Sequence, residues 1–210
     1  METSTAPAPL RTSRARQTLA KKQHVLDVAR AEFVRHGYRA TTMDAIAQLS
    51  GVSKRSLYLW HEDKPALFKA CLIDGARRIP PLPYDPEGAI DVGLRDFGVA
   101  LLQEFTRPTT IGMGMLLVRE AQEFPELADL ARRNRDEYMI RPLAHHLHRT
   151  GLAGSDAVAA ADLLMSMILV PVHNHLLFGD AVPSEAYFQA HVVQAIATFL
   201  HGRTAAGTPA

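Results

Sequence analysis

The sequence predicts an all-α protein, and three observations support this fold class. Apolar residues recur every three or four positions through most of the chain, which is the period of one helix face. No clear run of alternating β-branched residues is present, so strands are not needed. The segment IPPLPYDPEG, residues 79–88, has the composition of a linker and divides the helices into two groups. We therefore expect an N-terminal domain of three to four helices followed by a helical bundle.

The first two helices are expected at residues 18–36 and directly after Thr42. Gly37 follows the last residue of the first apolar stripe and is typical of a helix stop. Thr42 is a natural N-cap, and Gly51 supplies the positive φ that ends the second helix after about two turns.

The third and fourth helices are expected to begin after Ser53 and Asp63, which are both capping residues. In the third helix Leu57 would face inward. Three other side chains of that helix would face outward: Lys54, Arg55 and Tyr58.

Longer amphipathic helices follow the linker, at residues 87–105, 109–124, 125–150, 156–178 and 184–200. Both ends of the chain lack periodicity and are expected to be disordered. The expected organisation is a disordered basic arm (1–18), a first domain (19–79), a second domain (80–201) and a disordered tail (202–210).

Charge divides the chain in the same way. Residues 1–80 contain 14 Lys and Arg against 7 Asp and Glu, whereas residues 81–210 contain 9 against 15. A basic module joined to an acidic one indicates that the first meets a polyanion, although chance clustering on a solvated surface explains the charge equally well.

The spacing of the second and third helices gives the polyanion a more specific identity. Ile46 and Leu57 are placed to pack across a turn at Gly51, which is the arrangement of a helix-turn-helix at residues 42–61. In that motif the second helix enters the major groove of DNA. The outward Lys54, Arg55 and Tyr58 are donors suited to guanine edges and phosphates.

Residues 33–68, FVRHGYRATTMDAIAQLSGVSKRSLYLWHEDKPALF, resemble the DNA-binding signature of the tetracycline-repressor (TetR) family. The family pattern is roughly F-x-x-x-G-Y-x-x-T-T-x-x-x-I-A-x-x-x-G-V-S-x-x-x-L-Y-x-x-F-x-x-K-x-x-L-F. The matching positions are Phe33, Gly37, Tyr38, Thr41, Thr42, Ile46, Ala47, Gly51, Val52, Ser53, Leu57, Tyr58, Lys64, Leu67 and Phe68.

This resemblance implies a role for each matched polar residue and for the neighbours on the third helix. Phosphate contacts are implied for Thr42, Tyr58 and Lys64. The residues nearest the base edges would be Ser53, Lys54 and Arg55.

One departure from the family pattern lies where the third helix ends. His61 stands at the position of the family's buried Phe, and Trp60 precedes it. Either Trp60 turns inward or the corner between the third and fourth helices is repacked.

The second domain is similar to the C-terminal domain of the AefR-like branch of the family, through LLVREAQEFPELA at residues 116–128 and the Phe-Leu pair at 199–200. The resemblance implies a homodimer whose last two helices form the interface. The last helix carries an apolar stripe that serves either the core or a partner: Phe188, Val192, Ala195, Ile196 and Phe199.

A small-molecule effector is expected in the second domain, and the lack of charge in its stripes favours a hydrophobic one. The candidate lining residues, each of which is also a plausible ordinary core residue, are Phe97, Leu101, Met113, Met115, Leu143, Met167 and His173.

Enzymatic and metal-binding functions find little support. His145 and His148 share a helix face but lack a third ligand, and the chain contains no G-x-S-x-G, H-E-x-x-H, G-x-G-x-x-G or P-loop pattern. The lone Cys71 falls on a core stripe. We expect no catalytic residue, no cofactor and no metal.

The sequence therefore predicts a cytoplasmic, homodimeric transcriptional regulator, a repressor that leaves a palindromic double-stranded operator when its effector binds. No secretory signal and no membrane-spanning segment are expected. Two alternatives remain open: a dimeric small-molecule-binding protein that has lost DNA recognition, and a constitutive DNA binder without an effector switch.

Overall fold

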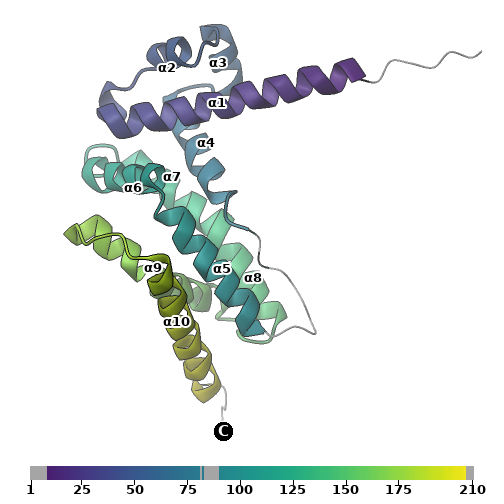
Figure 1. Ribbon diagram of the computed structural model, residues 1–210, viewed down its shortest axis with the longest axis vertical. Helices are drawn as coiled ribbons and strands as arrows, with labels where there is room; N and C mark the ends of the chain where they lie inside the picture. The colour runs from purple at the N-terminus through teal and green to yellow at the C-terminus, as the bar shows by residue number, and fades with distance from the viewer. Residues whose placement is uncertain (1–8, 81, 83–89, 207–210) are drawn as a thin grey trace, which may run out of the picture. The chain divides into compact units, whose positions relative to one another are not determined.

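The computed structural model describes residues 9–80, 82 and 90–206, and the side chains of residues 14–80, 82 and 91–202. All regular elements in these ranges are helices, so the expected all-α class is confirmed (Figure 1). In order they are α1 (Pro9–Ala40), α2 (Met43–Leu49), α3 (Lys54–Trp60), α4 (Lys64–Ala76), α5 (Ile90–Phe105), α6 (Pro108–Glu120), α7 (Pro125–Arg135), the π-helical η1 (Asp136–Ile140), α8 (Arg141–Arg149), α9 (Ala157–Phe178) and α10 (Glu185–Ala206).

The chain forms two compact units, Met1–Cys71 and Leu72–Ala210. The division falls inside α4 and not at the proline-rich segment after Ile79, where composition places it. The reason is that Ala76, near the end of α4, is buried in the hydrophobic core of the second unit. Composition detects a linker, but it does not detect a helix shared by two cores.

In the first unit, α1 begins at Pro9, so residues 9–18 are helical and the prediction that they are disordered is wrong there. Proline fits a first helical turn, and the Leu, Arg, Ala and Gln that follow are good helix formers. Residues 1–8 of the predicted arm lie outside the described residues.

Gly37 interrupts α1 as its position predicts. Its backbone has φ 81° and ψ 167°, which lie far from helical values. The buried Thr41 hydroxyl then donates to the carbonyl oxygens of Gly37, at 2.7 Å, and Glu32, at 3.1 Å. This local network fixes the corner from which α2 starts.

Three aromatic rings form the centre of the first core. The centroids of Phe33, Tyr38 and Phe68 lie 5.2 to 5.8 Å apart, in one stacked and two edge-to-face pairs. All three residues are buried, together with Val25 and Ala29 of the same α1 stripe.

The second unit is a helical bundle in which α8 packs on α9 and α10 packs on α5. The predicted helix at 125–150 is present, but a π-helical turn divides it into α7 and α8. Pro142 explains this turn, because it has no N–H to donate to Tyr138 and its ring would clash with the Tyr138 carbonyl in a regular helix.

A second proline links α9 to α10. Pro171 lies inside α9 and cannot donate a hydrogen bond to the Met167 carbonyl four residues earlier. That carbonyl instead accepts a hydrogen bond from Nε2 of His191 on α10, at 3.0 Å. A side chain of α10 thus supplies the hydrogen bond that the carbonyl oxygen loses to the proline.

The C-terminal helix continues to Ala206, so residues 202–206 of the predicted disordered tail are helical, and residues 207–210 lie outside the described ranges. Within those ranges, α9 is long and apolar enough to cross a membrane, but 44% of its most apolar stretch is buried in the bundle. Core helices of soluble proteins have the same character, so this is weak evidence for a membrane segment.

Candidate nucleic-acid interface

The helix-turn-helix of α2 and α3 is built by one buried pair and two caps. Ile46 and Leu57 are both fully buried, and Gly51 between them has φ 66°. The side chains of Thr42 and Ser53 accept hydrogen bonds from the backbone N–H groups of Ala45 (3.2 Å) and Ser56 (3.1 Å). Because α3 buries Leu57, its opposite face is left to solvent.

The exposed face of α3 carries two candidate DNA ligands, of which one forms an ion pair within the protein and the other does not. Lys54 forms an ion pair with Asp44 of α2, with Nζ and Oδ2 2.5 Å apart. The neighbouring Arg55 is exposed, and its guanidinium has no hydrogen bond or ion pair with any described residue. The ammonium group of Lys54 is therefore engaged within the protein, whereas the guanidinium of Arg55 is not engaged by any described residue.

All three predicted phosphate ligands lie at one hollow of about 380 Å³ at the start of α2. Thr42 is exposed there, and its hydroxyl proton remains available after its oxygen has capped α2. Tyr58 is 48% exposed. The full lining of this hollow is Arg39, Thr41, Thr42, Met43, Asp44, Tyr58 and Lys64.

Lys64 lines the same hollow, and it also makes contacts within its own unit that its sequence position did not predict. Its Nζ donates to the carbonyl oxygens of Tyr38 (2.8 Å), Thr41 (3.0 Å) and Arg39 (3.3 Å). It also lies 4.4 Å from the centroid of the Tyr38 ring. An ammonium group has three protons to donate. These donations fasten α4 to the corner after Gly37, and a phosphate at the hollow would compete with the three carbonyl oxygens for the ammonium group.

At the corner between α3 and α4, where the sequence departs from the family pattern, Trp60 does not turn fully inward. Trp60 stays partly exposed, with the Lys22 ammonium 5.6 Å from its ring centroid. His61 is half-buried, and its Nε2 has no hydrogen-bond partner among the described residues. Burial, with a smaller contribution from the positive charge of Lys22, lowers the pKa of His61. The imidazole is therefore neutral at pH 7.

The seven predicted effector contacts do not form one group. Phe97, Leu101 and Leu143 belong to the buried core, and Met167 packs partly against it. Met113 of α6 is buried as well. Met115 is 51% exposed and His173 is also exposed, so neither is part of the buried core. Both lie on helix faces that point away from the core, and the apolar sequence around them did not reveal this.

The apolar stripe of α10 does not form the dimer interface that the sequence analysis predicted but is part of the core. Phe188, Val192, Ala195, Ile196 and Phe199 are all buried inside their own unit. The packing against α5 is close, since a Cβ added at Gly98 would lie 2.7 Å from Cγ1 of Val192. These residues have no surface left for a partner.

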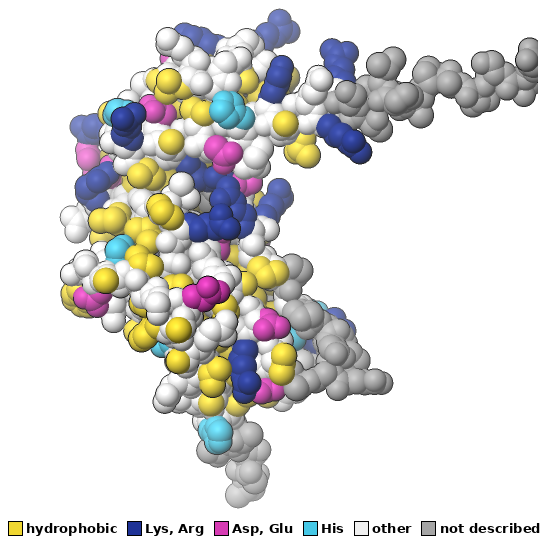
Figure 2. Space-filling model, in the orientation of Figure 1, with side chains coloured by type: hydrophobic (Ala, Val, Ile, Leu, Met, Phe, Trp, Pro, Cys, Tyr) yellow, Lys and Arg dark blue, Asp and Glu magenta, His cyan; other side chains and the backbone are white. Residues whose placement is uncertain are grey.

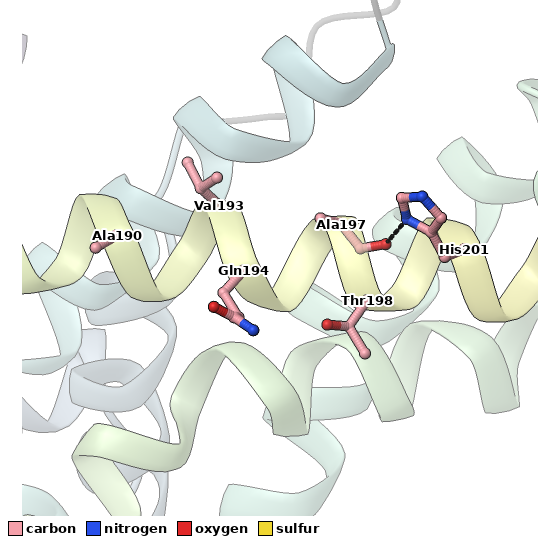
Figure 3. A pocket seen from close by; sticks show the side chains of 6 residues that line it. All are labelled: Ala190, Val193, Gln194, Ala197, Thr198 and His201. Carbon is pink, nitrogen blue, oxygen red and sulfur yellow. Dashed lines mark hydrogen bonds between the residues drawn. The ribbon is translucent and has the colours of Figure 1, made fainter.

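The opposite face of α10 is hollowed by small side chains, a feature that the sequence analysis missed (Figure 3). The hollow measures about 520 Å³ and is lined by Ala190, Val193, Gln194, Ala197, Thr198 and His201. On α9, the exposed Leu163, Val170 and Leu177 recur at seven-residue intervals. Small residues at i, i+3 and i+7 on α10 were the signal that could have found this face.

Comparisons with known proteins agree with this architecture. Residues 25–71 match the family model of the bacterial regulatory proteins of the tetR family, and residues 92–202 match that of the AefR-like transcriptional repressor C-terminal domain. The HTH-type transcriptional repressor SCO4008 of Streptomyces coelicolor is 29% identical over 178 residues, which cover 79% of this chain and 87% of that protein.

Solved structures show the same fold. The Flavonoid-responsive Regulator FrrA has a TM-score of 0.68 and 28% identity, covering 87% of this chain and 96% of its own. A putative TetR-family transcriptional regulator from Mesorhizobium loti has a TM-score of 0.70 and 24% identity, covering 88% and 97%. The second family model spans more than half of the chain. The chain therefore belongs to the tetR family of transcriptional regulators, in the branch with an AefR-like C-terminal domain.

Proposed function

We propose that this regulator is a cytoplasmic homodimer that represses transcription by binding a palindromic operator. A small hydrophobic effector releases the dimer from the operator. The observation that carries the proposal is the exposed face of α3, where Arg55 is unpaired among the described residues and lies one helical turn from Tyr58 on an N-capped helix. A guanidinium donor at the start of a recognition helix suits the O6 and N7 acceptors of guanine.

The homodimer is proposed to form through the exposed faces of α9 and α10. The α9 face contributes Leu163, Val170 and Leu177, and the α10 face contributes the hollow around Val193. Small side chains allow two helices to approach closely, and a symmetric dimer uses the same patch twice. Each subunit would then supply one α3 to each operator half-site.

The effector is proposed to be an apolar molecule that carries hydrogen-bonding groups. The second core is apolar around Phe97, Leu101 and Leu143. Two polar atoms buried in that unit, Oδ1 of Asn134 and Nε2 of His146, have no partner among the described residues. Burial lowers the pKa of His146, with help from Arg149 and His145, so its ring is neutral and can share a proton with a hydroxyl group.

Flavonoids, which are aromatic and hydroxylated, are suitable first probes because the related FrrA is named as flavonoid-responsive. The test begins with a footprint of the purified protein on the DNA upstream of its own gene. A protected palindrome is expected, and a flavonoid that binds should weaken operator affinity at least about tenfold, or about 1.4 kcal/mol of coupling. Operator DNA should weaken flavonoid binding by the same factor.

The same experiment separates the alternatives. A protein that binds flavonoids but protects no DNA is a small-molecule-binding protein and not a regulator. Operator affinity that stays constant while a ligand is bound would identify a constitutive DNA binder.

A further inference from the structure

The N-terminal part of α1 extends away from the core of its unit. Every side chain from Arg14 to Lys22 is exposed, and the first buried residue of the helix is Val25. Helical turns without tertiary contacts are only marginally stable in water. Packing therefore does not explain why this segment, the basic extension (residues 14–22), is part of the helix.

The charge of the basic extension has one sign. It contains Arg14, Arg16, Lys21 and Lys22, and no Asp or Glu occurs from residue 9 to residue 26. Arg14, Arg16 and Lys21 form no ion pair with any described residue. Figure 2 shows dark blue side chains on both sides of this part of the molecule. The segment is a row of unneutralised cations.

The basic extension starts beside the recognition helix. Lys22 lies over the ring of Trp60, which is the last residue of α3. Within this unit, α1 runs along α2 and α3 and then continues past them (Figure 1). The cations therefore begin at the C-terminal end of α3, the helix whose first residues, Lys54 and Arg55, are proposed to read DNA.

We infer that the basic extension binds the phosphate backbone of double-helical DNA that flanks each half-site. The inference rests on the proposed operator binding and adds a second contact to it. DNA offers one negative charge per about 1.7 Å of helix axis, which suits a row of cations. An anionic membrane is a poorer partner, because an interfacial helix needs a broad apolar face and the segment offers only Leu19 beside its alanines.

The test uses the full chain with Arg14→Ala, Arg16→Ala and Lys21→Ala combined. Lys22 is kept because it contacts Trp60. Affinity is measured over a salt series on two duplexes. The short duplex has both half-sites, and the long duplex has about ten further base pairs, one helical turn, on each side.

The wild type should bind the long duplex more tightly than the short one. The triple variant should lose that preference and bind the long duplex roughly tenfold more weakly than the wild type does. Its salt slope on the long duplex should fall by about 0.9 for each phosphate that is no longer neutralised.

A matched control removes three exposed arginines of the second unit, with Arg119→Ala, Arg132→Ala and Arg133→Ala, and should keep the preference for the long duplex. Equal affinity of the wild type for both duplexes would overturn the inference, as would an equal loss by the triple variant on both. Failure of the proposed function is a separate result, in which the wild type does not distinguish operator from scrambled DNA. Alanine favours helix, so circular dichroism should show a folded triple variant.

Discussion

The Nζ atom of Lys64 lies 2.8 Å from the carbonyl oxygen of Tyr38 and 4.4 Å from the centroid of the same residue's ring. One side chain at the start of α4 thus holds both the backbone and the ring of the residue that follows Gly37. This corner precedes Thr42, the N-cap of α2, so we propose that Lys64 positions the helix-turn-helix.

Lys64→Ala should therefore lower the free energy of unfolding by about 2 kcal/mol, because three carbonyl oxygens lose a charged donor. Denaturant unfolding of the full chain measures this. Operator and random DNA should both bind more weakly, while the salt slope stays unchanged. A salt slope reduced by about 0.9 per subunit, with stability unaltered, would instead identify Lys64 as a phosphate ligand.

Arg55→Ala should cost roughly 1 to 3 kcal/mol on the operator and relax base preference at one position in each half-site. The reason is that the guanidinium is exposed and unpaired among the described residues, so its removal affects DNA and not the fold. Competition with operators substituted one base pair at a time measures the preference. Arg133→Ala, which removes an exposed arginine of the second unit, serves as the control and should leave the preference intact.

Much of the first unit could be predicted because its signals are local. Gly37, Thr42, Gly51 and Ser53 each act on the backbone within a few residues, and each does in the structure what its residue type predicts. The bonds of Lys64 join residues 23 to 26 positions apart, and sequence spacing does not reveal a contact of that range.

The second unit was harder to predict for a different reason. The stripe through Val192 and Ile196 has the same spacing whether it packs on α5 or on a second subunit. Only the burial of these residues in their own unit decides between the two. Effector contacts are likewise hidden, since an apolar stripe such as Phe97 and Leu101 serves a core and a binding site equally well.

His61→Phe should make the protein more resistant to acid. Burial and Lys22 hold the pKa of the folded His61 below 6.5, so as the pH falls the unfolded chain takes up a proton that the folded chain does not. His61 therefore makes the protein lose stability as the pH drops below about 6.5, and its own effect on stability vanishes at higher pH. Phenylalanine, the family's residue at this position, removes this contribution and the unpartnered Nε2.

Denaturant midpoints from pH 5 to pH 8 test this change. The curve for His61→Phe should be flatter than that of the wild type. It should not be level, because burial lowers the pKa values of His146 and His173 as well. Parallel curves for the two proteins would show that His61 does not contribute.

The neighbouring valines of α10 provide the sharpest test of the dimer, because one faces the core and the other faces solvent. Val192 is fully buried and contacts the α5 region at Gly98, whereas Val193 is 42% exposed and lines the hollow. Val192→Asp should place an unpaired carboxylate in the core and unfold the second unit. Val193→Asp should leave the fold intact and place two like charges across the symmetric interface, giving a folded monomer.

Size-exclusion chromatography with light scattering measures the mass of each variant, and circular dichroism measures its fold. Val118→Asp, which changes another exposed valine in α6, should remain dimeric. Because one subunit covers only one half-site, the Val193→Asp monomer should also lose most of its operator affinity. If Val193→Asp stays dimeric and Val118→Asp becomes a monomer, the interface lies on α6 and not on α10.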